Sequence, residues 1–138
     1  MDSIEKAYLQ IILEAQYETD IWKRFGKYHE IEIYYNIEHV KQRLNERYPN
    51  VTFNHIRNIV NKFIKIILND KTLDKVKGNE LSFTVHCTLS DIWFSGRFKR
   101  NSEKWRVYIS TLLSSRDQNG NKITPKYSAN DYRKDIYV

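Results

Sequence analysis

Cysteine, proline and glycine are scarce in this sequence, whose 138 residues include one cysteine, two prolines and four glycines. The single cysteine, Cys87, excludes an intramolecular disulfide and any zinc site built from several thiolates. With so few prolines and glycines, long unstructured loops are not expected. No apolar run approaches the roughly 20 residues that a membrane-spanning helix needs. The composition therefore predicts a folded protein without a disulfide framework or a membrane span.

A basic leader is also missing, because Asp2 and Glu5 stand where a secretory signal peptide carries positive charge. Together with the lone cysteine, this absence favours a cytoplasmic location. The chain does contain enough apolar material for a core, since 41% of its residues are hydrophobic and 14% are aromatic. These fractions exclude a disordered chain and suit a single domain over residues 1–138.

Positive charge is concentrated in two blocks of the sequence, and the net charge is +6. Residues 36–68 carry six basic and two acidic side chains, and residues 95–138 carry ten and four, whereas residues 1–35 carry four and seven. Such clustering reports on association rather than on fold. It favours a polyanionic partner.

Helix and strand patterns alternate along the chain and predict an α+β fold, with a helical part at 3–68 and a β-rich part at 81–138. The first half is expected to form a helix from Ser3 to about Tyr17, a helical turn through Trp22 and Phe25, a strand at 30–35, a helix capped by Asn36 and stopped by Pro49, and a helix from Thr52 to about Leu68. The second half is expected to form strands at 81–89 and 105–113 with extended chain between them, an Asn119–Gly120 turn and a strand at 122–124.

The helix expected at 52–68 has an unusual polar face. Solvated helix faces ordinarily mix acids with bases, because opposite charges four residues apart stabilise a helix and raise its solubility. Here no carboxylate accompanies the polar side chains, which lie opposite the apolar positions of Phe53, Ile56, Ile59, Val60, Phe63 and Ile64. The polar set is Asn54, His55, Arg57, Asn58, Asn61, Lys62 and Lys65.

These residue types suit the major groove of double-stranded DNA. Asn matches the N6 and N7 atoms of adenine, Arg matches O6 and N7 of guanine, and a carboxylate would repel the phosphates. We therefore expect Lys62 and Lys65 to contact the DNA backbone. The candidate base-reading residues are Asn54, His55, Arg57, Asn58 and Asn61.

A second cationic segment, residues 96–106 (GRFKRNSEKWR), lies between two predicted strands. A basic loop in this position is suited to straddling phosphates beside the groove. Aromatic and cationic residues also alternate in RNA-binding hairpins, so this segment alone does not separate DNA from RNA. Its candidate DNA contacts are Arg97, Lys99, Arg100, Lys104 and Arg106.

The order of elements over about residues 3–113 resembles the winged helix-turn-helix domain, and residues 36–68 resemble the helix-turn-helix of bacterial regulators. Within them, LNERYPNVTFNHIRNIVNKF is similar to the ferric-uptake-regulator type. The resemblance implies a winged helix with an enlarged C-terminal antiparallel β region, a recognition helix at 52–68 and a basic wing at 96–106. That family's metal-binding cysteines and dimerisation domain are absent, so no metal or other cofactor is carried over.

Two other functional classes remain open. His86, on the polar side of the strand at 81–89, is the candidate general base of a small basic ribonuclease or toxin-like protein that works without metal. A viral or host-factor-binding interaction protein is the third interpretation. Cys87 is expected to be a core thiol. No HExxH, CxxC, P-loop or GxSxG motif occurs, so no catalytic residue is assigned and an enzyme is not the preferred interpretation.

The preferred prediction is a double-stranded DNA-binding protein, either a transcription regulator or a replication or partition factor of a mobile element. A homodimer is expected, because one recognition helix reads only a few base pairs. The first helix also offers more apolar residues than one buried stripe needs: Ile4, Tyr8, Leu9, Ile11, Ile12 and Leu13.

Overall fold

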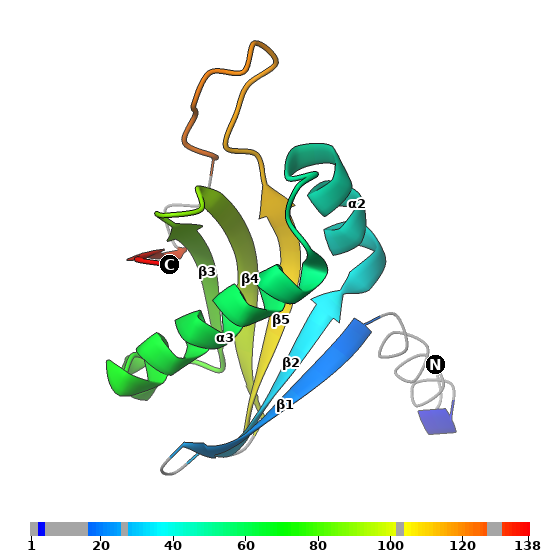
Figure 1. Ribbon diagram of the computed structural model, residues 1–138. Coiled ribbons are helices and arrows are strands. Elements are labelled where there is room, and N and C mark those ends of the chain that lie inside the picture. The colour runs from blue at the N-terminus through cyan, green and yellow to red at the C-terminus, as the bar shows by residue number, and fades with distance from the viewer. Residues whose placement is uncertain (1–2, 5–16, 26–27, 102–103, 127–130) are drawn as a thin grey trace.

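The computed structural model describes residues 3–4, 17–25, 28–101, 104–126 and 131–138 (Figure 1). In this part of the chain the predicted α+β class is confirmed. The strands are β1 (Tyr17–Phe25), β2 (Tyr28–Asn36), β3 (Glu80–Cys87), β4 (Ile92–Asn101), β5 (Lys104–Leu113) and β6 (Tyr132–Ile136). The helices are α2 (Ile37–Arg47) and α3 (Phe53–Asn69), followed by the short 3-10 helix η1 (Leu73–Lys75).

The described strands form one mixed sheet in the order β1-β2-β5-β4-β3-β6. β1 and β2 form an antiparallel hairpin, and β3, β4 and β5 form an antiparallel meander. The two groups are joined by parallel pairing of β2 with β5, in which Ile31 lies opposite Trp105. β6 adds to the other edge, parallel to β3. Segments far apart in the sequence are therefore neighbours in the sheet.

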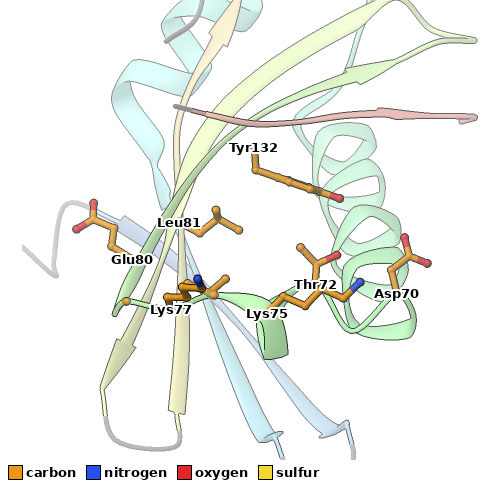
Figure 2. A pocket seen from close by; sticks show the side chains of 9 residues that line it. Asp70, Thr72, Lys75, Lys77, Glu80, Leu81 and Tyr132 are labelled. Atoms are coloured by element: carbon orange, nitrogen blue, oxygen red, sulfur yellow. The ribbon is translucent and has the colours of Figure 1, made fainter. Parts of the chain in front are cut away.

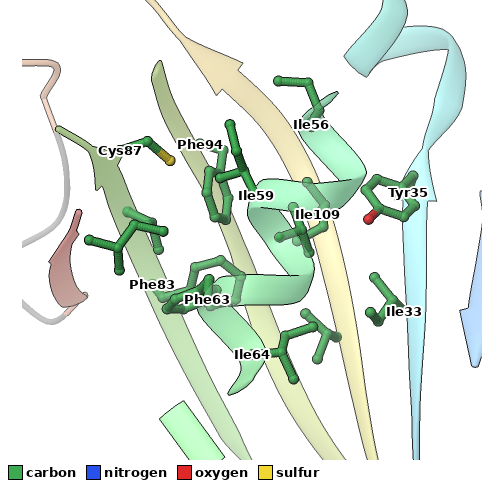
Figure 3. Packing of buried hydrophobic residues seen from close by; sticks show 14 of the residues in the cluster. Ile33, Tyr35, Ile56, Ile59, Phe63, Ile64, Phe83, Cys87, Phe94 and Ile109 are labelled. Atoms are coloured by element: carbon green, nitrogen blue, oxygen red, sulfur yellow. The ribbon is translucent and has the colours of Figure 1, made fainter. Parts of the chain in front are cut away.

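α3 lies across one face of the sheet and forms the core with it (Figures 1 and 3). Phe63 is at the centre, with its ring centroid 5.0 Å from that of Phe83, 5.6 Å from Phe94 and 6.1 Å from Phe98. Full burial of such a side chain is worth roughly 1.5–3 kcal/mol, so this contact layer contributes strongly to stability. The helical residues buried in it are Ile56, Ile59, Val60, Phe63, Ile64 and Ile67.

Both helices of the predicted pair are confirmed, with the caps differing. Thr52 caps α3 as predicted, because its side chain accepts a hydrogen bond from the backbone N–H of His55 at 3.1 Å. Asn36 occupies the N-cap position of α2 as predicted, but its side chain makes no capping hydrogen bond. Tyr48, after α2, is buried and fixes the pair to the sheet. Its hydroxyl donates to the carbonyl of Leu113 at 2.6 Å and accepts from the N–H of Trp93 at 3.2 Å.

The strands predicted at 30–35, 81–89 and 105–113 are present as β2, β3 and β5, with different ends. On β5 the predicted alternation fails after Ile109, and Leu112 is buried instead of Leu113. The reason is a bulge: Gly96 pairs with Ile109 and Ser95 with Thr111, which leaves Ser110 as the extra residue. A Cβ on Gly96 would lie 2.0 Å from the carbonyl oxygen of Tyr108, so only glycine fits there.

Three predicted elements were wrong. The helical turn through Trp22 and Phe25 is part of the strand β1. No strand runs through residues 122–124, where only an isolated bridge joins Arg116 to Lys122, while β6 was not predicted. The basic segment 96–106 is not a loop, because β4 and β5 extend through most of it. The helix predicted at 3–17 lies almost entirely outside the described residues.

Candidate nucleic-acid interface

The polar residues predicted on α3 all lie on the side of the helix that faces away from the sheet. We call this set the α3 outer face: Asn54, His55, Arg57, Asn58, Asn61, Lys62 and Lys65. Arg57 and Asn61 are partly buried and the other five are exposed. The buried apolar stripe of α3 fixes this orientation, because the two sets of residues alternate with helical period. The structure therefore brings all seven together on one side of one helix.

No carboxylate occurs anywhere in α3, from Phe53 to Asn69. Its first turn also lacks an acid, so the partial positive charge of the helix N-terminus is not offset by a neighbouring side chain of that turn. α2 adds a cation here, since Nζ of Lys41 lies 5.5 Å from the ring centroid of Phe53. Of the two acids of α2, Glu46 forms an ion pair with Arg43 at 2.7 Å. The α3 outer face is therefore rich in hydrogen-bond donors and cations and contains no acidic residue of its own.

The cations predicted in the basic segment 96–106 do not join this surface. Phe98, Trp105 and Val107 are fully buried beneath the helices. Alternation along a strand then directs the residues between them to the other side of the sheet. The expectation of one wing-like loop beside the helix was therefore wrong. Arg97, Lys99, Lys104 and Arg106 lie on the sheet side opposite α3.

Arg100 lies apart from the other four cations. It pairs with Trp105 across β4 and β5, and its guanidinium is 5.3 Å from the Trp105 ring centroid. Its Nη2 donates to the carbonyl of Gly78 at 3.3 Å, and its backbone N–H donates to the carbonyl of Asn79 at 2.7 Å. Arg100 therefore ties the η1–β3 connection to the sheet.

Carboxylates neutralise much of the opposite sheet face, a name we use for Glu32, Tyr34, Arg97, Lys99, Lys104, Arg106 and Tyr108. Glu32 lies 3.4 Å from Arg106 and 3.6 Å from Lys104, and Glu80 lies 3.4 Å from Arg97. The hydrogen bond from Tyr34, and then the charges of Arg106 and Lys104, lower the pKa of Glu32 against the raising effect of its partial burial. On this face, two carboxylates are therefore paired with three of the four cations.

Aromatic rings also lie on the opposite sheet face. Tyr34 stacks on Tyr108 with 5.2 Å between ring centroids, and Arg106 and Lys99 lie over these rings at 5.7 Å. An RNA-binding sheet needs exposed rings on which bases can stack. Tyr34 is only 7% exposed. The opposite sheet face therefore lacks one of the free stacking platforms that single-stranded RNA would use.

His86 lies on the polar side of β3, as predicted, but in acidic surroundings. Its Nε2 is 2.8 Å from a carboxylate oxygen of Asp91, and its Nδ1 is 3.9 Å from one of Asp135. Its ring stacks on Trp93 with centroids 4.1 Å apart. Two carboxylates beside the imidazole would repel an RNA phosphate, which disfavours His86 as a ribonuclease base. The sequence did not reveal these partners, because Asp135 reaches His86 only through the unpredicted strand β6.

The Cys87 prediction is confirmed. The side chain is fully buried on the apolar side of β3, and burial raises the pKa of its thiol to about 12. A thiol held neutral in this way is not a nucleophile at physiological pH.

No group of three or more His, Cys, Asp or Glu side chains among the described residues has the arrangement of a metal site. None of the described helices is both long enough and apolar enough to cross a bilayer.

Comparison of the chain with protein-family models, curated proteins and solved structures finds no match. Of the two cationic surfaces described above, the α3 outer face has no carboxylate among its residues, and most of its side chains are exposed. It is the candidate interface.

Proposed function

We propose that this protein binds double-stranded DNA through the α3 outer face. One observation carries the proposal: seven polar residues, none of them acidic, line the outward side of a 17-residue helix whose other side is anchored in the core. At 1.5 Å per residue, such a helix is about 25 Å long. The major groove, about 12 Å wide, accepts a helix of this kind.

Each residue of the face has a chemical role in this proposal. Asn54, Asn58 and Asn61 can pair with adenine edges, Arg57 with guanine, and His55 with a purine acceptor. Lys62 and Lys65 contact phosphates, which position the helix without reading sequence. A firmly packed helix supports such contacts, because its side chains start from a fixed backbone.

The proposal includes a helix-turn-helix, which is one part of the winged-helix domain that the sequence resembles. α2 and α3 would act as its two helices, with α2 contacting the DNA backbone through residues such as Lys41. The basic wing does not belong to it, because the strand cations lie on the other side of the sheet. Regulation of transcription and replication or partition of a mobile element both require DNA binding of this kind.

Salt-dependent binding of the full chain to a random-sequence duplex, compared with single-stranded RNA of equal length, tests the proposal. The duplex should bind more tightly. Replacing both Lys62 and Lys65 with Gln should reduce the slope of log affinity against log salt by about 2. The matched control is Lys122→Gln with Lys126→Gln, which removes the same charge from exposed positions elsewhere.

Three outcomes would count against the proposal. No duplex binding at low salt would favour a surface for a protein partner. Tighter binding to single-stranded RNA than to the duplex would show that RNA, and not double-stranded DNA, is the preferred ligand. Equal losses in the Lys62/Lys65 variant and in its control would mean that only total charge matters.

We also propose that the working form is a homodimer, on a two-fold DNA site with half-sites about 10 bp apart. The apolar residues of 4–13 that suggest the contact lie almost wholly outside the described residues, so the proposal rests on their sequence pattern. Light scattering of the full chain should give twice the monomer mass, and Leu9→Glu should reduce it. A monomeric mass both free and DNA-bound would refute the dimer.

A further inference from the structure

A pocket of about 770 Å³ lies where α3 ends, between the η1 connection, the start of β3 and the edge strand β6. Figure 2 shows the ring of Tyr132 on one side, with Thr72, Lys75 and Asp70 across from it. Leu81 and Val76 contribute apolar surface to its lining. The volume is in the range of small-molecule sites, about 300–1,000 Å³.

Backbone hydrogen bonds hold the connection that forms this pocket. Thr72 donates its N–H to the carbonyl of Ile67 at 3.1 Å, and Lys75 donates to the carbonyl of Thr72 at 3.1 Å. Leu73 anchors the turn in the core with 1% of its surface exposed. On the other wall, Arg100 holds the carbonyls of Gly78 and Asn79. The pocket is therefore preformed, which reduces the entropy that a ligand would have to overcome.

The charges in the lining are unequally compensated. Its two carboxylates are paired, since Asp70 lies 3.3 Å from Nζ of Lys134 and Glu80 lies 3.4 Å from Arg97. Its two ammonium groups, on Lys75 and Lys77, have no ion pair or hydrogen bond with any part of the chain that the structure describes. The pocket therefore offers two available positive charges and no unpaired carboxylate among these lining residues.

We propose that this pocket binds a nucleoside monophosphate or a similar small aromatic phosphate. A phosphate dianion matches the charge of Lys75 and Lys77. A planar ring finds the aromatic surface of Tyr132 and the apolar side chains of Val76 and Leu81. The hydroxyl of Thr72 supplies a polar contact for the sugar or base. This site is separate from the α3 outer face, so it does not depend on DNA binding.

Isothermal titration of the full chain with AMP, adenosine and inorganic phosphate tests the site. AMP should bind at least about tenfold more tightly than either of its two parts, because only AMP reaches both the lysines and the ring. Lys75→Gln with Lys77→Gln should weaken AMP binding by about tenfold or more. Lys122→Gln with Lys126→Gln should leave it unchanged, as a control for total charge.

A second variant separates the ring contact from charge. Tyr132→Leu keeps an apolar side chain but removes the stacking surface, and should weaken AMP binding while leaving phosphate binding unchanged. Amide chemical-shift changes on adding AMP to the unmodified protein should include Thr72 and Val76. No AMP binding at millimolar concentration, AMP binding no tighter than phosphate alone, or equal weakening by the control variant would each overturn the proposal. Loss of duplex binding by the Lys75/Lys77 variant, in a protein that does not bind AMP, would assign these lysines to the DNA backbone instead.

Discussion

The α3 outer face and the opposite sheet face carry similar numbers of cations but differ in what surrounds them. On the sheet, Glu32 and Glu80 lie within 3.6 Å of Lys104, Arg106 and Arg97. On α3 no acid occurs in the whole helix. A cation close to a carboxylate has less attraction left for a distant phosphate. Positive charge counted along a sequence therefore does not by itself predict a binding surface, because the fold can place carboxylates beside it.

Placing acids on the α3 outer face should give it carboxylates like those of the opposite sheet face. We expect the largest loss of duplex affinity from this change. Asn58→Glu adds a negative charge and Lys62→Glu reverses a positive one, both at exposed positions and without altering the buried stripe. Duplex affinity should fall by roughly a hundredfold, since each lost contact is worth about 1–3 kcal/mol and the new acids repel phosphate. Fluorescence anisotropy with a labelled duplex measures it. An affinity within a few-fold of the original protein would assign DNA binding to another surface.

Removing single donors from the same helix should change sequence preference more than total affinity. Asn54→Ala and Asn58→Ala should each cost about 1–3 kcal/mol at a preferred site and relax the base preference locally. Selection from a randomised duplex library shows the change. Identical selected sequences for both variants and for the unmodified protein would contradict base reading by α3.

Glu32→Gln tests the role of the opposite sheet face, which we expect to be stability. The side chain of Glu32 is only 16% exposed and lies beside two cations, so the variant should lose about 1–2 kcal/mol of unfolding free energy at pH 7. Duplex affinity should stay within about twofold, because the change is on the side of the sheet away from α3. Urea unfolding and anisotropy on the same samples separate the two effects.

The stabilisation by Glu32 should also depend on pH. The pKa of Glu32 is lowered in the folded protein from its ordinary value of 4.5. Its contribution is therefore complete above that value and is lost as the pH falls through the lowered, folded-state pKa. Glu32→Gln should lose less stability than the unmodified protein between neutral and acidic pH. An equal loss in both proteins would contradict the assignment.

The smallest effect is expected from Lys99→Ala with Arg100→Ala. A wing at this position would lose about two phosphate contacts and two units of salt slope. Lys99 faces the side of the sheet away from α3, and Arg100 is engaged with Gly78 and Trp105. The slope should therefore change by less than about half a unit. A decrease of two units in the salt slope would instead support the original interpretation of this segment as a DNA-contacting wing.

Local pattern was enough to predict α3, because its apolar residues have helical spacing and Thr52 supplies a cap. The same holds for β3, where Leu81, Phe83, Val85 and Cys87 alternate. β1 and β6 were missed because both are edge strands with many polar residues, whose pairing depends on distant partners. Local periodicity alone was therefore enough to predict that the candidate DNA-contacting residues of α3 share one side of the helix.

The charged partners of the candidate site residues were harder to predict from sequence, because pairing between strands that are distant in the sequence brings them together. Glu32 meets Arg106 only because β2 lies beside β5, and Asp135 meets His86 only because β6 lies beside β3. No local pattern contains that information. The bulge at Ser110, which changes the side chain buried after Ile109, depends equally on the register with β4.

The parallel pairing of β2 with β5 also constrains how the chain can fold. Ile31 and Trp105 are neighbours in the sheet, so joining them closes a loop of roughly 70 residues and costs entropy before any contact stabilises it. During synthesis, α3 leaves the ribosome before β4 and β5 exist to cover Ile56 and Phe63. Until then its apolar side is open to chaperones or to other chains. The helix that presents an acid-free surface outward thus also carries an apolar side whose partner strands are made later in synthesis.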